Sequence, residues 1–158
     1  QKVSVEQASI KQVSADGTTI TNIALDGDRL RRLGKWQKAA DAYQRAIRLG
    51  DAAPQVHHAL GQVYFHQGRF LAAVNAYQHA NSMAPDDIFF ACDLGGAWAA
   101  DVYRQATKRH PKARLAWTGL AEALSAQGNH KKSAEISEML ADDKNDFNEN
   151  VFCDKSNS

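Results

Sequence analysis

The stretch from Ala53 to Pro85 reads APQVHHALGQVYFHQGRFLAAVNAYQHANSMAP and has the periodicity of two helices joined by a tight turn. The first helix has a face at positions i, i+3, i+4 and i+7, made of His57, Leu60, Gly61 and Tyr64. The second has a matching face made of Ala73, Ala76, Tyr77 and Ala80. Gly68 lies between them, where glycine enters left-handed backbone space without steric cost. Pro85 ends the second helix, so the stretch predicts one helix–turn–helix unit.

The spacing within this stretch resembles the tetratricopeptide repeat, a helix–turn–helix unit of about 34 residues. The matching positions are Leu60, Gly61, Tyr64, Gly68, Phe70, Ala73, Tyr77, Ala80 and Pro85. One such unit cannot bury its own apolar face, so the resemblance implies neighbouring repeats. It implies an all-α fold, a right-handed superhelix of about four units.

Related spacing on both sides of this unit divides the chain into repeats. Their approximate bounds are 20–53, 54–87, 88–113 and 114–145. In the first repeat, Asp26 stands where a large apolar residue is usual, as is common in a terminal repeat. The last repeat has Ser133 and Ser137 in its second helix, which suits a cap that faces solvent. Residues 1–19 predict an extended or flexible leader, and residues 146–158 an acidic C-terminal tail.

The third repeat is eight residues short. Pro85 and Pro111 are 26 residues apart, where the repeat predicts about 34. The shortfall falls just after Ala100 and leaves two explanations. Either the repeat is truly shortened and residues 88–110 form one fused helix, or the sequence lacks a loop. The pair Gly95–Gly96 is unfavourable inside a long helix and favours the missing loop.

The composition is that of an ordinary globular protein. Charged residues make up 23%, apolar residues 44%, and the formal net charge is +1. We expect no binding of nucleic acid or of a membrane surface, since both favour concentrated basic charge. No apolar run approaches the roughly 18 residues needed to span a bilayer. The sequence begins with Gln1 and not with Met, so a lipid anchor upstream of Gln1 is the one route to a membrane that we expect.

The sequence shows no catalytic constellation: it has no nucleophile elbow, P-loop or glycine-rich dinucleotide fingerprint. His58 and His66 lie about 12 Å apart along one helix, which is too far for one small ion. We therefore expect no enzymatic activity, no cofactor and no metal site. Cys92 and Cys153 leave two alternatives: one core thiol and one tail thiol, or a disulfide between tail and third repeat in an oxidising compartment.

In the proteins that these repeats resemble, the first helices of successive repeats line a concave groove. The groove residues carried over to this chain are Asp28, Arg31, Arg32, His58, Gln62, Phe65, His66, Phe89 and Glu122. Phe65 and Phe89 are aromatic residues outside the packing positions and beside polar groups. Either they form an exposed apolar patch that binds a partner, or both pack against neighbouring repeats or the leader.

The resemblance implies a non-catalytic scaffold that binds a peptide, helix or loop of a partner protein in this groove. The Ala- and Gln-rich repeats are similar in style to bacterial periplasmic lipoproteins that assemble pili or secretins, of the tight-adherence (Flp) pilus or type IV pilotin type. That similarity implies a periplasmic or outer-membrane-anchored protein, with the cytoplasm as the alternative. Two other interpretations are a docking module of a larger enzyme or secretion protein, and a structural protein that assembles into homo-oligomers.

Overall fold

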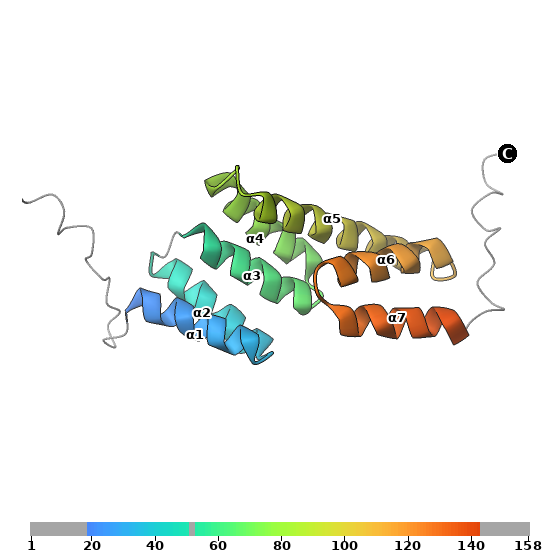
Figure 1. Ribbon diagram of the computed structural model, residues 1–158, viewed down its shortest axis with the longest axis horizontal. Coiled ribbons are helices and arrows are strands. Elements are labelled where there is room, and N and C mark those ends of the chain that lie inside the picture. The colour runs from blue at the N-terminus through green and yellow to red at the C-terminus, as the bar shows by residue number, and fades with distance from the viewer. Residues whose placement is uncertain (1–18, 51–52, 143–158) are drawn as a thin grey trace, which may run out of the picture.

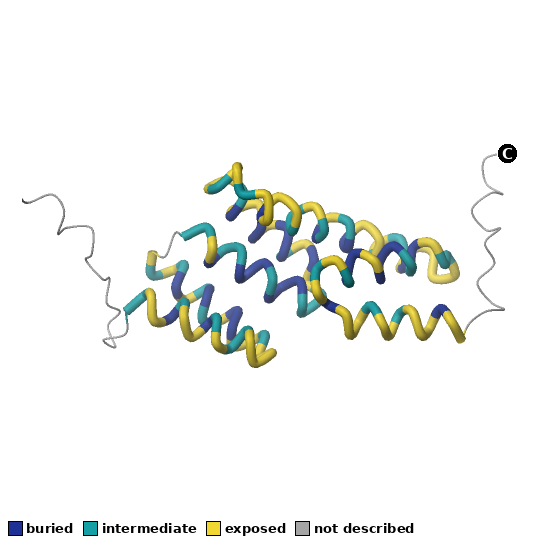
Figure 2. The backbone as a smooth tube through the Cα atoms, viewed as in Figure 1, coloured by how far each residue is buried: buried dark blue, intermediate teal, exposed yellow. Residues whose placement is uncertain are grey.

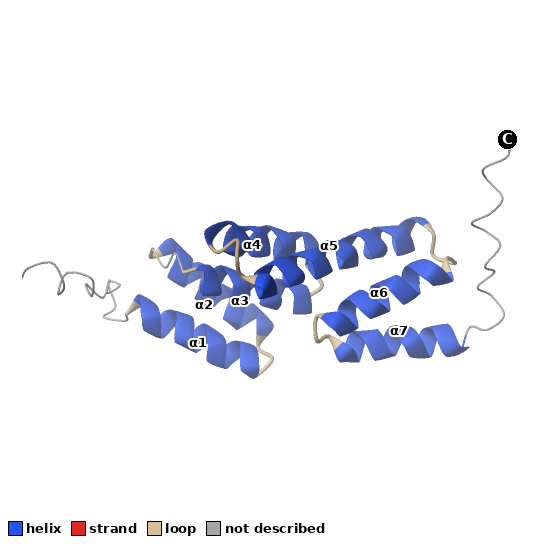
Figure 3. Cartoon of the chain, turned by 45° about the horizontal axis from the view of Figure 1, so that its top comes forward, coloured by secondary structure: helices blue, strands red, loops and turns tan. Residues whose placement is uncertain are grey.

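The structure is a computed structural model that describes residues 19–50 and 53–142. These residues form seven α-helices (Figures 1 and 3). The helices are α1 (Ile20–Arg32), α2 (Trp36–Arg48), α3 (Pro54–His66), α4 (Phe70–Met83), α5 (Ile88–Arg109), α6 (Arg114–Ala126) and α7 (His130–Asp142). Each helix packs against the next one along the chain. The all-α repeat fold predicted from the sequence is confirmed.

Three of the connections between helices have the same turn. It links α1 to α2, α3 to α4 and α6 to α7, and in each case a glycine lies at its centre. Gly34, Gly68 and Gly128 have φ angles of 68°, 74° and 77°, in the left-handed region that favours glycine. The backbone N–H of Gly68 donates to the carbonyl of Phe65 at 2.9 Å, and the other two turns repeat this hydrogen bond. The identical turn gives these three helix pairs one geometry.

A tyrosine ring against a glycine holds the two helices of each of the first two repeats together. An ideal Cβ added at Gly27 would lie 2.8 Å from the Tyr43 ring, and one added at Gly61 would lie 2.6 Å from the Tyr77 ring. Both tyrosines are 1% exposed. Only a residue without a side chain lets the ring come this close, so the glycine sets the distance between the helices.

The core runs along the middle of the helix stack (Figure 2). It is built from alanines at the helix contacts and larger side chains between them. The fully buried alanines are Ala39, Ala46, Ala73, Ala80, Ala97 and Ala100. Small residues at these positions let neighbouring helix axes approach, and the aromatic rings fill the remaining space.

The third repeat is not a helix pair but the single helix α5, 22 residues long. The expectation of a missing loop is therefore wrong for this structure, and the fused-helix alternative describes it. Gly95 has no atom within 4 Å of an ideal Cβ, so no tyrosine lies against it. Tyr103 lies against Gly119 of α6 instead and is 37% exposed.

The glycine pair does not break α5, because contacts at Gly96 and further along hold the helix. A Cβ at Gly96 would overlap the side chain of Gln127, so this glycine makes room for a neighbour. Further along, buried Asp101 accepts hydrogen bonds from Arg104 and Gln105, each at 2.7 Å. Arg104 also donates to the carbonyl of Gly68 at 2.8 Å and so ties α5 to the α3–α4 turn.

Some sequence predictions lie outside the described residues. They concern the leader before residue 19, the tail at 146–158 and the pairing of Cys153 with Cys92. Cys92 itself is exposed on α5, so the alternative that made it a core thiol is wrong.

Gly61 and Gly95 have different environments, so replacing each with alanine should have opposite effects on stability. Gly61→Ala should lower the free energy of unfolding by about 1–3 kcal/mol, because the new methyl group overlaps the Tyr77 ring. Gly95→Ala is the matched control and should raise it by about 0.4–1 kcal/mol, because its site is an open helix position. Urea denaturation of dilute protein measures both, and equal effects would contradict the glycine–tyrosine contact.

Candidate functional site

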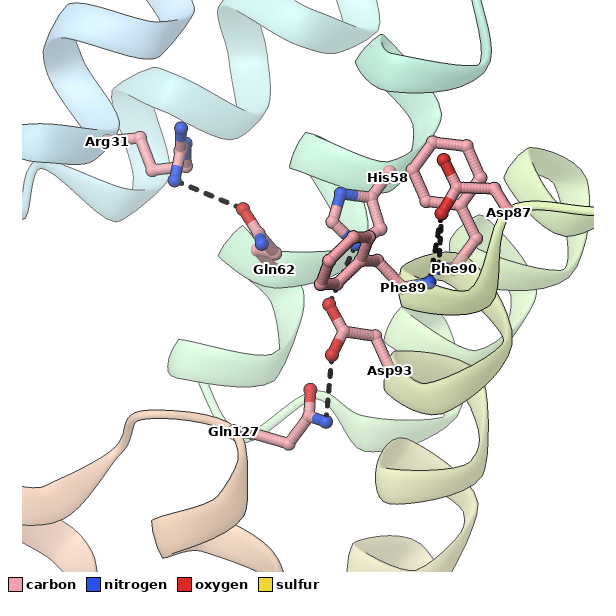
Figure 4. Close-up of polar contacts among 8 residues, drawn as sticks. All are labelled: Arg31, His58, Gln62, Asp87, Phe89, Phe90, Asp93 and Gln127. Atoms are coloured by element: carbon pink, nitrogen blue, oxygen red, sulfur yellow. Dashed lines mark hydrogen bonds and ion pairs between the residues drawn. The ribbon is translucent and has the colours of Figure 1, made fainter. Parts of the chain in front are cut away.

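A cavity of about 220 Å³ lies where helices of the first two repeats face α5 and the end of α6. Its lining comes from five helices and the turn after α6, namely Arg31, Trp36, Gln62, Phe65, His66, Tyr77, Asp93 and Gln127. Figure 4 shows side chains from α1, α3, α5 and this turn converging. The lining is mostly polar, unlike the core beneath it.

One wall of the cavity is a hydrogen-bonded network that joins the first two repeats. The Tyr43 hydroxyl donates to Asp28 at 2.6 Å, and Arg31 donates to the Tyr43 hydroxyl at 3.3 Å and to the amide oxygen of Gln62 at 3.0 Å. Arg31 also forms a 3.5 Å ion pair with Asp28. Burial and the hydrogen bond to Asp28 raise the pKa of Tyr43 to about 12. This tyrosine therefore stays protonated at neutral pH and holds Arg31 in place.

The opposite wall is a second network, which joins α3, α5 and the end of α6 (Figure 4). His58 Nε2 lies 2.7 Å from one carboxylate oxygen of Asp93, and the Gln127 amide donates to the other at 3.1 Å. The His58 ring also lies 4.6 Å from the Phe90 ring, centre to centre. His58 is thus partly buried and engaged, which makes it a residue that positions Asp93.

His66 closes one end of the cavity. Its ring stacks on Trp36, with centroids 4.4 Å apart and planes 2° from parallel. Burial, followed by the charges of Lys132 and Arg31, lowers the pKa of His66 below its ordinary value of 6.5. The neutral imidazole is therefore favoured at physiological pH, and it can accept a hydrogen bond as well as donate one.

The structure corrects the prediction for Phe65. This side chain is 1% exposed and packs on Phe70 with ring centroids 4.9 Å apart, so it cannot serve as an exposed partner-binding residue. The reason is the Gly68 turn, which folds α4 back and brings Phe70 over Phe65. Arg104 of α5 covers the Phe70 ring at 4.9 Å and completes the burial.

Phe89 has the opposite environment. It lies in the first turn of α5 and is 75% exposed. The Asp87 side chain accepts hydrogen bonds from the backbone N–H groups of Phe89 and Phe90 at 2.9 and 3.3 Å, which fixes this helix start. Asp93 lies one turn further along, so Phe89 stands on the cavity side of α5.

The remaining predicted residues lie apart from the cavity. Arg32 is exposed and donates to the carbonyl of Asp28 at 3.4 Å, and Glu122 is exposed on α6. Sequence reasoning missed Trp36, Asp93 and Gln127. Trp36 is partly buried against the core. Gln127 reaches Asp93 because α6 lies along α5.

Among residues 19–50 and 53–142, no three His, Cys, Asp or Glu side chains are grouped so that they could hold a metal ion. Of the helices in those ranges, none combines the length and the apolar character that crossing a membrane needs.

Three family models match the sequence. The models are described as "TPR repeat", matching residues 27–68, and "Tetratricopeptide repeat", matching residues 54–87 and 98–146. The match to residues 98–146 begins inside α5, at Trp98, and so includes only the C-terminal part of the fused helix. No curated protein matches the sequence.

Solved structures share the fold. Two structures titled as crystal structures of MamA superpose with TM-scores of 0.51 and are 16% identical in sequence. Each alignment covers 81% of this chain, and they cover 80% and 74% of the MamA chains. At this identity the similarity supports the fold alone.

The two phenylalanines should respond differently to truncation. Phe65→Ala is expected to lower the free energy of unfolding by about 3–5 kcal/mol, because it leaves a cavity between α3 and α4. Phe89→Ala, the matched control, should change it by less than about 0.5 kcal/mol because the ring is exposed. Thermal and urea denaturation compare the two, and a similar loss for both would contradict the burial described.

His66 should make the protein less stable in acid. Because its folded pKa lies below 6.5, the unfolded chain takes up the proton more readily, and stability falls as the pH drops below that value. Lys132→Ala should raise the pKa of His66 by removing a nearby positive charge, while burial still keeps it below 6.5. An NMR titration of the imidazole protons measures the pKa of His66 in the parent protein and in the Lys132→Ala variant. An ordinary pKa in the parent protein would contradict the prediction.

Proposed function

Residues 27–87 and 98–146 are tetratricopeptide repeats, and we propose that their polar cavity binds an extended segment of a partner protein. Such repeats imply a scaffold for protein–protein interaction. The observation that supports this site is the convergence of Arg31, Gln62 and Gln127 from three parts of the chain on one cavity. Exposed Phe89 stands beside it on α5.

The amide groups in the cavity suit a peptide backbone. The oxygen of Gln62 is bonded to Arg31, which leaves its amide nitrogen for a carbonyl of the ligand. The amide nitrogen of Gln127 is bonded to Asp93, which leaves its oxygen for an N–H of the ligand. One donor and one acceptor held on facing elements match the alternating groups of an extended chain.

The size of the cavity favours a peptide over a small molecule. Its volume of about 220 Å³ is below the roughly 300–1,000 Å³ usual for small-molecule pockets. A peptide needs only to lay part of its chain here, with a neighbouring apolar side chain on Phe89. Asp93 already faces His58 and Gln127. Arg31 is the arginine of the cavity lining, and an acidic group of the ligand would share it with Asp28.

A role in pilus or secretin assembly, and a place in the periplasm or at the outer membrane, remain finer proposals. The Ala- and Gln-rich composition of the repeats supports them. No residue of the cavity bears on them. The native N-terminus would test them: a signal sequence ending in a cysteine directly before Gln1 would support an anchored lipoprotein. A plain Met start would contradict it.

A peptide selection tests the binding proposal. A phage-displayed library of random peptides would be selected on the immobilised full chain, and the Kd of the enriched peptides measured by fluorescence anisotropy. We expect Gln62→Ala and Phe89→Ala each to weaken binding by at least about tenfold, since both groups would contact the ligand.

Leu71→Ala serves as the control because Leu71 is exposed on α4 and does not line the cavity. Its Kd should equal that of the parent chain. Failure to enrich any peptide, or peptides that bind all three variants equally well, would contradict the assignment of this cavity.

A further inference from the structure

The outer face of α5 is apolar although it is exposed. From residue 88 to residue 103, none of the exposed side chains is charged. They are Ile88, Phe89, Ala91, Cys92, Gly95, Trp98, Val102 and Tyr103. Figure 2 shows exposed positions along the whole of this helix. Apart from Phe89, which lies on the cavity side, and Tyr103, which lies against Gly119 of α6, this strip faces away from the core, and such an uncharged strip marks an interaction surface.

The strip contains a glycine and a tyrosine at the positions that contact each other within each of the first two repeats. Gly27 and Tyr43 lie 16 residues apart and meet across a turn, as do Gly61 and Tyr77. The corresponding residues of the third repeat are Gly95 and Tyr103, only eight apart on α5. Along one helix they are separated by about 12 Å and cannot meet. Gly95 therefore has empty space beside it, while Tyr103 lies against Gly119 of α6 and leaves part of its ring exposed.

We propose that a second copy of this chain covers the strip, with the two α5 helices antiparallel about a two-fold axis. Gly95 of each copy then faces the exposed part of the Tyr103 ring of the other, so one symmetric arrangement adds two glycine–tyrosine contacts. The axis passes beside Ala99, midway between these residues. The two helices that make the glycine–tyrosine contact in each of the first two repeats are also antiparallel.

The charges at the ends of α5 fit this orientation. Exposed Asp86 precedes the N-terminus of the helix, and exposed Lys108, Arg109 and Lys112 lie at its C-terminal end. Antiparallel pairing brings the acidic end of one helix to the basic end of the other at both edges of the interface. It also opposes the two helix dipoles, whereas parallel pairing would place like charges together.

The strip is about 24 Å long, from the rise per residue of an α-helix. One helix face against another buries an area at the low end for stable complexes, so the dimer should depend on concentration. The peptide site and the dimer face lie on different sides of α5, because Phe89 and Asp93 face the cavity. Failure of one proposal therefore leaves the other standing.

Sedimentation equilibrium of the full chain between about 1 µM and 1 mM tests the dimer. We expect the mass to rise from monomer to dimer across this range. Trp98→Glu and Val102→Glu should each keep the chain monomeric, because they place a charge in the interface. Both side chains are exposed in the monomer, at 44% and 58%, so circular dichroism should stay helical. Leu71→Glu, at an exposed site on α4, is the control and should dimerise normally.

A cysteine on the axis tests the register. In a Cys92→Ser and Cys153→Ser background, Ala99→Cys should form a disulfide-linked dimer under mild oxidation, and Leu71→Cys should not. A chain that stays monomeric at every concentration would overturn the proposal. So would a dimer that survives both glutamate substitutions, or one in which Ala99→Cys does not cross-link.

Discussion

Close contact between a glycine and a tyrosine ring on adjacent helices determines how this chain packs. Gly27 and Gly61 have no side chain, so Tyr43 and Tyr77 lie directly against the opposing backbone and are almost completely buried. The contact sets the distance between the helices of a repeat, and the shared glycine turn sets their direction. Fully buried alanines continue the same close approach along the stack.

The loss of eight residues in the third repeat removes this contact without disrupting the helix. The chain continues straight through Ala100, and Arg104 and Asp101 attach the continued helix to the α3–α4 turn. Two consequences follow. α6 lies along α5 so that Gln127 reaches Asp93 and completes the polar cavity. The opposite face of α5, which a second helix would cover in a full repeat, becomes surface.

The candidate site was predictable in part. Of the groove residues predicted from repeat spacing, Arg31, Gln62, Phe65 and His66 line the cavity, and His58 lies immediately behind it. The alternative that Phe65 is exposed is wrong because the burial of that ring depends on Phe70 and Arg104, which the turn and α5 bring to it. Asp93 and Gln127 were missed since their meeting requires a helix pairing that the regular repeat does not have.

The sequence alone determined the helix–turn–helix units. The spacing of apolar positions and the turn glycines is local information, and three helix pairs follow it. Only the tertiary structure decided the form of the third repeat. The same eight-residue shortfall fits a missing loop or a fused helix. The choice between them depends on contacts of Arg104 and Gln127 with residues distant in the chain, whose energies no local pattern contains.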